Sequence, residues 1–84
     1  MIKVLYFARL REQLGSAGDQ LQASPELADV AAVMRHLQAR GGDWADVFGD
    51  GQPVLMAVNQ EMADLSTRLD DGDEIAFFPP VTGG

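Results

Sequence analysis

The stretch DDGDEIAFFPP, residues 70–80, holds the signals that decide the fold. Residues 70–73 combine aspartates with a glycine, which is the composition of a tight turn. Residues 74–78 become apolar after the first position and include two phenylalanines, as in a strand with two apolar faces. Pro79 and Pro80 have no N–H group to donate to a sheet, so this strand ends before them. The stretch therefore predicts a turn followed by the last strand of the domain.

The start of the chain predicts another strand. Residues 1–8 are rich in β-branched and aromatic side chains, which favour a pleated, half-buried environment. Because side chains alternate along a strand, each of these two strands divides its residues between two faces. One face holds Val4, Tyr6, Ile75 and Phe77, and the other holds Leu5, Phe7, Ala76 and Phe78.

These two faces have different expected roles. If the first set packs against a helix, the second set lies on the opposite side of the sheet. Leu5, Phe7 and Phe78 then form an apolar patch beside the end of the chain, and such a cluster predicts a docking surface. The alternative, that loops or a second copy of the chain cover the patch, stays open at this point.

The middle of the chain predicts one main helix with two possible starts. Ser24 could cap it with Pro25 as its first residue, or Asp29 could cap it directly before the apolar pattern begins. We favour Asp29, because apolar residues then recur at helical spacing and two glycines end the helix. The apolar stripe consists of Val30, Val33, Met34 and Leu37, and the glycines are Gly41 and Gly42.

Shorter elements fill the remaining chain. Residues 15–19 form a turn cluster, and residues 21–23 are a candidate hairpin partner for the first strand. Residues 54–59 predict a strand and residues 66–69 a short strand. Residues 43–48 predict one short helical turn that closes the end of the core with Trp44, Val47 and Phe48.

The resulting order is strand, strand, helix, strand, short strand, strand. One helix covers only one face of such a sheet, so we expect a two-layer α+β domain over residues 1–78 and an extended tail over residues 79–84. With 84 residues and no cysteine, the chain is a single domain that packing alone must stabilise.

Composition excludes several classes of protein. No apolar run approaches the roughly 20 residues that span a bilayer, and no basic segment precedes a cleavable apolar stretch, so we expect a cytoplasmic protein without a membrane contact. The net charge of −7 opposes binding to phosphate backbones and argues against a nucleic-acid partner. It suits a basic protein partner, or it serves solubility alone; both interpretations remain open here.

The last residues, PPVTGG, predict a projecting arm. Two prolines stiffen its base, and residues 79–84 reach about 20 Å when extended. Gly83 and Gly84 carry no side chains, so the carboxylate could pass down a narrow tunnel into the active site of another protein. The alternative is a frayed glycine tail without a role.

Other candidate sites are weaker. The acidic turn at residues 70–74 lacks EF-hand spacing, because the position for the bidentate glutamate is Val81, so we interpret it as a turn and expect no metal site. His36, the only histidine, has no serine or cysteine constellation and is interpreted as solvated. The sequence lacks a phosphate-cradling glycine loop, so we expect this chain to bind no ATP itself.

The chain resembles the ubiquitin-like β-grasp sulfur carriers, specifically the small-subunit family of molybdopterin synthase, the MoaD type. The resemblance spans the full length and is specific at both ends. It rests on the start MIKVLYFA at residues 1–8, on AVNQ at 57–60, on LDDGDEIAFFPPV at 69–81, and on the terminal Gly83 and Gly84. It implies a ubiquitin-like β-grasp fold, in which the first and last strands lie parallel at the centre of a mixed sheet of about five strands. One main helix packs on one face, and a flexible Gly-Gly tail follows.

The resemblance also implies a chemistry. A ubiquitin-activating-like adenylyltransferase would use ATP and magnesium to adenylate Gly84, and a sulfur relay would convert the acyl-adenylate to a thiocarboxylate. The large, catalytic subunit of molybdopterin synthase would then pass this sulfur to the pterin precursor, cyclic pyranopterin monophosphate, to form a dithiolene. The chain itself would be a non-catalytic carrier, with no cofactor of its own, in a heterotetramer.

By the same resemblance, several residues are expected to contact the partners. The contact surface would hold Phe7, Met62 and Phe78, and the arm entering the partner would hold Pro79, Pro80, Val81, Thr82, Gly83 and Gly84. Met62 rests on the resemblance alone. Two alternatives share the Gly-Gly ending: a carrier for thiamine or another thiolated product, and a ubiquitin-like protein modifier.

Overall fold

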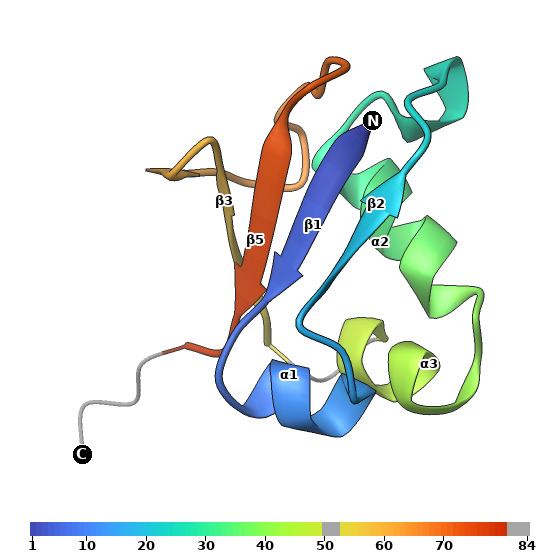
Figure 1. Cartoon of the computed structure of the whole chain (residues 1–84), viewed down its shortest axis with the longest axis vertical. Helices are drawn as coiled ribbons and strands as arrows, with labels where there is room; N and C mark the ends of the chain where they lie inside the picture. The colour runs from blue at the N-terminus through green and yellow to red at the C-terminus, as the bar shows by residue number, and fades with distance from the viewer. Residues whose placement is uncertain (50–52, 81–84) are drawn as a thin grey trace.

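The computed structural model describes residues 1–49 and 53–80 (Figure 1). This part of the chain forms five strands, three α-helices and one short 3₁₀ helix. The strands are β1 (Ile2–Tyr6), β2 (Gly18–Leu21), β3 (Leu55–Val58), β4 (Glu61–Met62) and β5 (Glu74–Phe78). The helices are α1 (Arg9–Leu14), the 3₁₀ helix η1 (Pro25–Leu27), α2 (Val30–Gln38) and α3 (Gly42–Phe48).

The five strands form one mixed sheet in the order β2-β1-β5-β3-β4. At its centre β1 and β5 run parallel, with Val4 opposite Ile75 and Tyr6 opposite Phe77. The other pairs are antiparallel, and α2 with α3 supplies the long crossover that parallel neighbours need. Figure 1 shows β1 and β5 side by side. The α+β fold with a central parallel pair is therefore confirmed.

The main helix α2 begins where the capping pattern favoured it. Asp29 lies in an extended conformation, and its Oδ1 accepts a hydrogen bond of 2.8 Å from the backbone N–H of Ala32. Ser24 instead precedes η1, so the competing start is a separate 3₁₀ turn. Beyond the helix, Gly41 and Gly42 have φ values of 77° and 53°, which glycine adopts without strain. The stripe that α2 buries includes Val30, Val33 and Leu37.

Two further helices lie at one end of the sheet, where the sequence predicted at most a turn. Residues 43–48 belong to a complete α-helix, α3, and α1 was not predicted at all. Leu10 and Leu14 of α1, four positions apart, turn toward the core, and the intervening residues are good helix formers. That spacing was the available signal for α1, which covers the sheet end where β1 leaves the core.

The prediction of a strand at residues 66–69 was wrong. The short fourth strand is β4, and residues 66–69 contribute only an isolated bridge between Asp29 and Arg68. Asn59 and Gln60 have φ values of 50° and 70°, as in a two-residue hairpin turn. Because of this turn, residues 61 and 62 pair with β3 as β4, and residues 66–69 are not part of that pairing. The hairpin partner of β1 also begins earlier than predicted, at Gly18 and not at residue 21.

The core lies between the sheet and the helices. Aromatic rings from β1, β5 and α3 close one end: the ring centroids of Tyr6 and Trp44 are 5.3 Å apart, and those of Phe48 and Phe77 are 5.0 Å apart. The predicted closing role of the segment 43–48 is thus confirmed. Fully buried core residues include Val4, Leu10, Val30, Val33, Leu37, Val47, Ile75 and Phe77. Within the described ranges, none of the helices is long and apolar enough to cross a membrane.

Candidate functional site

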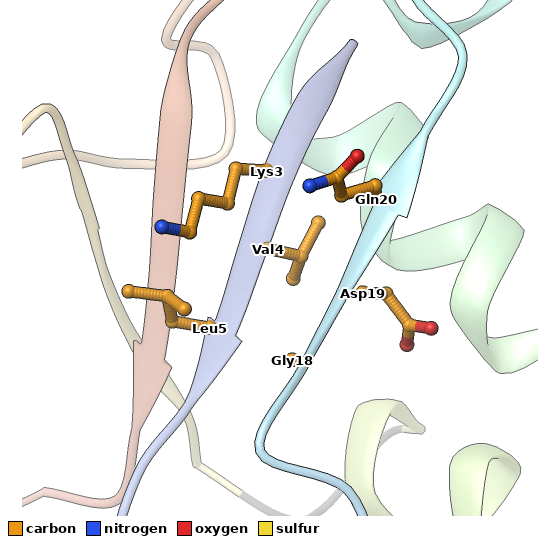
Figure 2. Close-up of a pocket in the computed structure, with 6 residues that line it drawn as sticks. All are labelled: Lys3, Val4, Leu5, Gly18, Asp19 and Gln20. Atoms are coloured by element: carbon orange, nitrogen blue, oxygen red, sulfur yellow. The ribbon is translucent and has the colours of Figure 1, made fainter.

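The face of the sheet that points away from α2 is apolar along its middle. One row of neighbouring positions crosses all five strands, because the registers of the four strand pairs align them. From β2 to β4 this row consists of Gly18, Leu5, Ala76, Ala57 and Met62. We call this side of the sheet the open face, and Figure 2 shows Leu5 extending over β5 on it.

A second row lies nearer to the end of β5. Leu55 pairs with Phe78, and Phe7 follows directly after β1 and donates its backbone N–H to the carbonyl oxygen of Phe77 at 3.1 Å. The Phe7 side chain is 44% exposed and Leu55 is 36% exposed, while Phe78 is half-buried. The predicted division of Leu5, Phe7, Ala76 and Phe78 from the core-facing residues is therefore confirmed.

The position of Phe7 depends on an unusual backbone conformation at the next residue. Ala8 has φ 54° and ψ −131°, and the N–H of Leu10 donates to the carbonyl oxygen of Phe7 at 3.1 Å. These values describe a tight turn in which the second residue normally is glycine. The turn ends β1 and starts α1 immediately, which leaves Phe7 at the edge of the open face.

Met62 lies on this face through the hairpin of β3 and β4. It pairs with Ala57, and its side chain is 67% exposed. No pattern in the sequence placed it there; the asparagine of the Asn59–Gln60 turn was the signal that could have done so. Leu55 and Ala57 were likewise not predicted as site residues, although they sit in the same rows.

The tail leaves the sheet beside these residues. Phe78 ends β5, and Pro79 and Pro80, both half-buried, follow it without strand pairing. Val81, Thr82, Gly83 and Gly84, to which the sequence assigned the arm and its reactive end, lie outside the described residues. The base of the tail thus emerges at the apolar end of the open face.

The opposite end of the open face is polar. Lys3 Nζ lies 3.8 Å from a carboxylate oxygen of Glu74, and both side chains are partly exposed. In the adjoining turn, Asp73 accepts a hydrogen bond from the backbone N–H of Asp70 at 2.7 Å and one from the Asn59 amide at 3.1 Å. These bonds lower the pKa of Asp73. Residues 70–73 form the predicted turn, closed by a bond from the N–H of Asp73 to the carbonyl oxygen of Asp70, and Glu74 already begins β5. No cluster of three potential metal ligands occurs among the residues that the structure describes.

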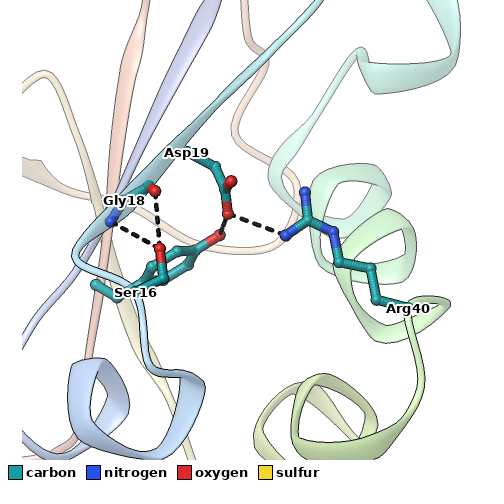
Figure 3. Close-up of polar contacts among 5 residues, drawn as sticks. Ser16, Gly18, Asp19 and Arg40 are labelled. Carbon is teal, nitrogen blue, oxygen red and sulfur yellow. Dashed lines mark hydrogen bonds and ion pairs between the residues drawn. The ribbon is translucent and has the colours of Figure 1, made fainter.

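On the core side, Asp19 ties β2 to the helices. Its Oδ2 accepts hydrogen bonds from the Tyr6 hydroxyl at 2.9 Å and from the Arg40 guanidinium at 3.0 Å (Figure 3). The Arg40 guanidinium also lies 4.4 Å from the centre of the Trp44 ring. Burial, followed by the bond to Asp19, raises the pKa of Tyr6. His36 is exposed on α2, where it lines a second hollow with Gln20, Leu21 and Leu27 among others.

Comparison with known proteins places the chain in a family. The ThiS family model matches residues 4–84. The molybdopterin synthase sulfur carrier subunit of Escherichia coli K12 is 45% identical over 84 residues, which cover both chains completely.

Solved structures agree. SAMP1 of Haloferax volcanii, a small archaeal modifier protein, has a TM-score of 0.78 at 31% identity, covering 99% of this chain and 98% of the other. A chain in the complex of subunits 1 and 2 of molybdopterin-converting factor from Helicobacter pylori has a TM-score of 0.68 at 26% identity, covering 99% and 97%. The chain therefore belongs to the ThiS family, among the ubiquitin-like β-grasp sulfur carriers of the molybdopterin synthase type.

Proposed function

We propose that this chain is the sulfur carrier subunit of molybdopterin synthase and that the carboxylate of Gly84 carries the sulfur. The observation that carries the proposal is the connection of the open face to the base of the tail: Phe7, Phe78 and Leu55 surround the point where Pro79 follows β5. A partner that docks on this apolar surface receives the tail at the same time. Full-length similarity to the E. coli sulfur carrier subunit supports this assignment.

The chemistry requires activation, because a carboxylate has no good leaving group. Attack of the Gly84 carboxylate on the α-phosphorus of ATP releases pyrophosphate and forms an acyl-adenylate. A sulfur nucleophile then attacks the acyl carbon and AMP leaves. When the donor is a persulfide, its terminal sulfur makes this attack, and a thiol then cleaves the S–S bond of the resulting acyl disulfide. This leaves a thiocarboxylate on Gly84 and a disulfide on the donor. In the large subunit the thiocarboxylate sulfur bonds to cyclic pyranopterin monophosphate, and water cleaves the thioester to return the Gly84 carboxylate; two such transfers build a dithiolene.

The partner proteins bind the small-molecule substrates. ATP and magnesium are held by the adenylyltransferase, and the pterin precursor is held by the large subunit. The carrier supplies a docking surface through Phe7, Met62 and Phe78, and an arm from Pro79 to Gly84 that reaches the distant active site. We expect two carriers to flank a dimer of large subunits in the cytoplasm, where ATP is available for activation.

Deletion of Gly84 tests the role of the tail. The shortened chain should keep its thermal unfolding midpoint, because the described core ends with β5, and it should support no dithiolene formation in an assay reconstituted with the large subunit. A matched control is Thr82→Ser, which preserves the length of the arm. Dithiolene formation with the shortened chain at the rate of the full chain would contradict the proposal.

A second candidate function is a ubiquitin-like protein modifier, in which activated Gly84 forms an isopeptide bond with lysines of target proteins. The structural similarity to SAMP1 favours it. Both functions begin with adenylation, so the fate of the activated tail separates them. Lysine-linked conjugates without any thiocarboxylate would support the modifier, and a thiocarboxylate on the free protein would support the carrier.

A further inference from the structure

The open face contains a hollow beyond the residues assigned to docking. It lies where β1 and β2 pair and has a volume of about 420 Å³ (Figure 2). Its lining consists of Lys3, Val4, Leu5, Gly18, Asp19 and Gln20. The hollow exists because Leu5 pairs with Gly18, which has no side chain to fill the space beside the leucine.

The fold itself keeps this space empty. A Cβ atom on Gly18 would lie 2.6 Å from the carbonyl oxygen of Val4 and 3.3 Å from the Leu5 side chain. Any larger residue would therefore push β2 away from β1. Glycine inside a strand weakens the strand and often marks the close approach of another backbone, which here is that of Val4.

The rim of the hollow carries a cation and an amide. Lys3 pairs with Gln20 across the two strands, so both side chains flank the space above Leu5. The lysine is 57% exposed, and its 3.8 Å separation from Glu74 is too long for a hydrogen bond. Lys3 is also the only lysine in a chain of net charge −7. Its ammonium group is thus free to take a second carboxylate from a partner.

Hydrogen bonds fix the β2 wall of the hollow. Ser16 bonds both backbone groups of Gly18: its hydroxyl donates to the Gly18 carbonyl at 2.9 Å and accepts from the Gly18 N–H at 3.3 Å (Figure 3). The next residue, Asp19, points toward the helices and binds Tyr6 and Arg40. A wall fixed in this way loses little freedom when a partner binds, which favours affinity.

We propose that this hollow is an anchor for the large subunit: an apolar side chain of that subunit enters it beside Leu5, and a neighbouring carboxylate pairs with Lys3. The inference rests on the proposed function, because the hollow continues the apolar row that runs from Met62 through Ala76 to Leu5. It extends the contact surface across the whole sheet to its β2 edge. The cation at the rim selects a partner surface that is acidic at this point.

Two variants probe the charge of Lys3 and the empty space beside Leu5 separately. Lys3→Glu reverses the charge of the rim, and Gln20→Trp fills the hollow; both residues are exposed, so the fold should survive. Arg35→Glu and Gln38→Trp are the matched controls, because they make the same charge change and the same glutamine-to-tryptophan change at exposed positions of α2. The dissociation constant for the purified large subunit is measured by calorimetry. Thermal unfolding of every variant confirms that it is folded.

Each probe variant should weaken binding at least tenfold, and each control less than twofold. The effect of Lys3→Glu should shrink as salt is added, since it arises from charge. Phe78→Asp is measured in parallel to separate the two proposals. If Phe78→Asp weakens binding but both probe variants bind as the unchanged chain does, the docking face stands and the anchor is refuted. If Phe78→Asp also has no effect, the proposed function fails as well.

The adenylyltransferase supplies a second comparison. If the probe variants weaken binding to that enzyme and leave binding to the large subunit unchanged, the hollow serves activation, and its assignment to the large subunit is refuted.

Discussion

Truncating Phe7 to alanine should weaken binding to the large subunit without unfolding the carrier. The Phe7 side chain is 44% exposed, and a phenylalanine buries about 200 Å² when fully covered, so docking can remove about 90 Å² of this ring from water. At about 25 cal/mol per Å² this area corresponds to about 2 kcal/mol. The dissociation constant should therefore rise about 30-fold.

The measurement is isothermal titration of the purified large subunit with each carrier variant. Leu65→Ala is the matched control: this side chain is 52% exposed, and the carbonyl oxygen of Leu65 accepts from the N–H of Ala31 in the first turn of α2, away from the open face. Its affinity should equal that of the unchanged chain. The rest of the ring, about 110 Å², is already covered in the free chain, so truncation should also lower the free energy of unfolding, by up to about 3 kcal/mol. Thermal unfolding of the variant therefore checks that it is folded at the temperature of the titration.

An unchanged dissociation constant for a folded Phe7→Ala variant would refute the assignment of the open face. An equal loss in Leu65→Ala would also refute it, because the loss would then reflect general apolar exposure and not this surface.

Three further predictions concern stability. Because the pKa of Tyr6 is raised, the folded chain keeps a phenol proton that the unfolded chain loses above about pH 10. The contribution of this proton to the free energy of unfolding is therefore complete below about pH 10 and declines above it by about 1.4 kcal/mol per pH unit. Tyr6→Phe should remove this decline in urea titrations between pH 8 and 12, and an identical pH dependence in both proteins would contradict it. Asp29→Ala removes the 2.8 Å cap bond to Ala32 and should cost about 1 kcal/mol of unfolding free energy in urea; Asp29→Asn, which can still cap, should cost less. Ala8→Gly relieves the strained φ of 54° and should raise the thermal midpoint by several degrees, whereas a lower midpoint would show that Ala8 is unstrained.

Sequence patterns identified the parts of the fold that depend on short-range signals. The final strand, the capped start of α2 and the alternation of core-facing and open-face residues all follow from spacing of 2 or 3.6 residues and from capping chemistry. Phe7 and Phe78 were found in this way. The parallel pairing of β1 with β5 came from the resemblance, because residues far apart along the chain leave no local signal of their contact.

The features that were missed depend on backbone turns. A two-residue turn with positive φ at Asn59 and Gln60 determines β4, and with it the place of Met62; asparagine favours that turn, but glutamine does not. The abrupt start of α1 follows from the turn at Ala8, a residue that rarely adopts such a conformation. The hollow at Gly18 was also hidden, because glycine in a turn-rich cluster predicts a turn before it predicts a strand.

The proposed function depends above all on sulfur being carried on Gly84. It can be tested by intact mass spectrometry of the purified protein after incubation with the adenylyltransferase, ATP, magnesium and a sulfur donor. The protein should gain the mass difference between sulfur and oxygen on the C-terminal fragment that contains Gly84, and the gain should be lost when ATP is omitted. If the protein binds the large subunit yet leaves this reaction with its mass unchanged, Gly84 does not carry the sulfur.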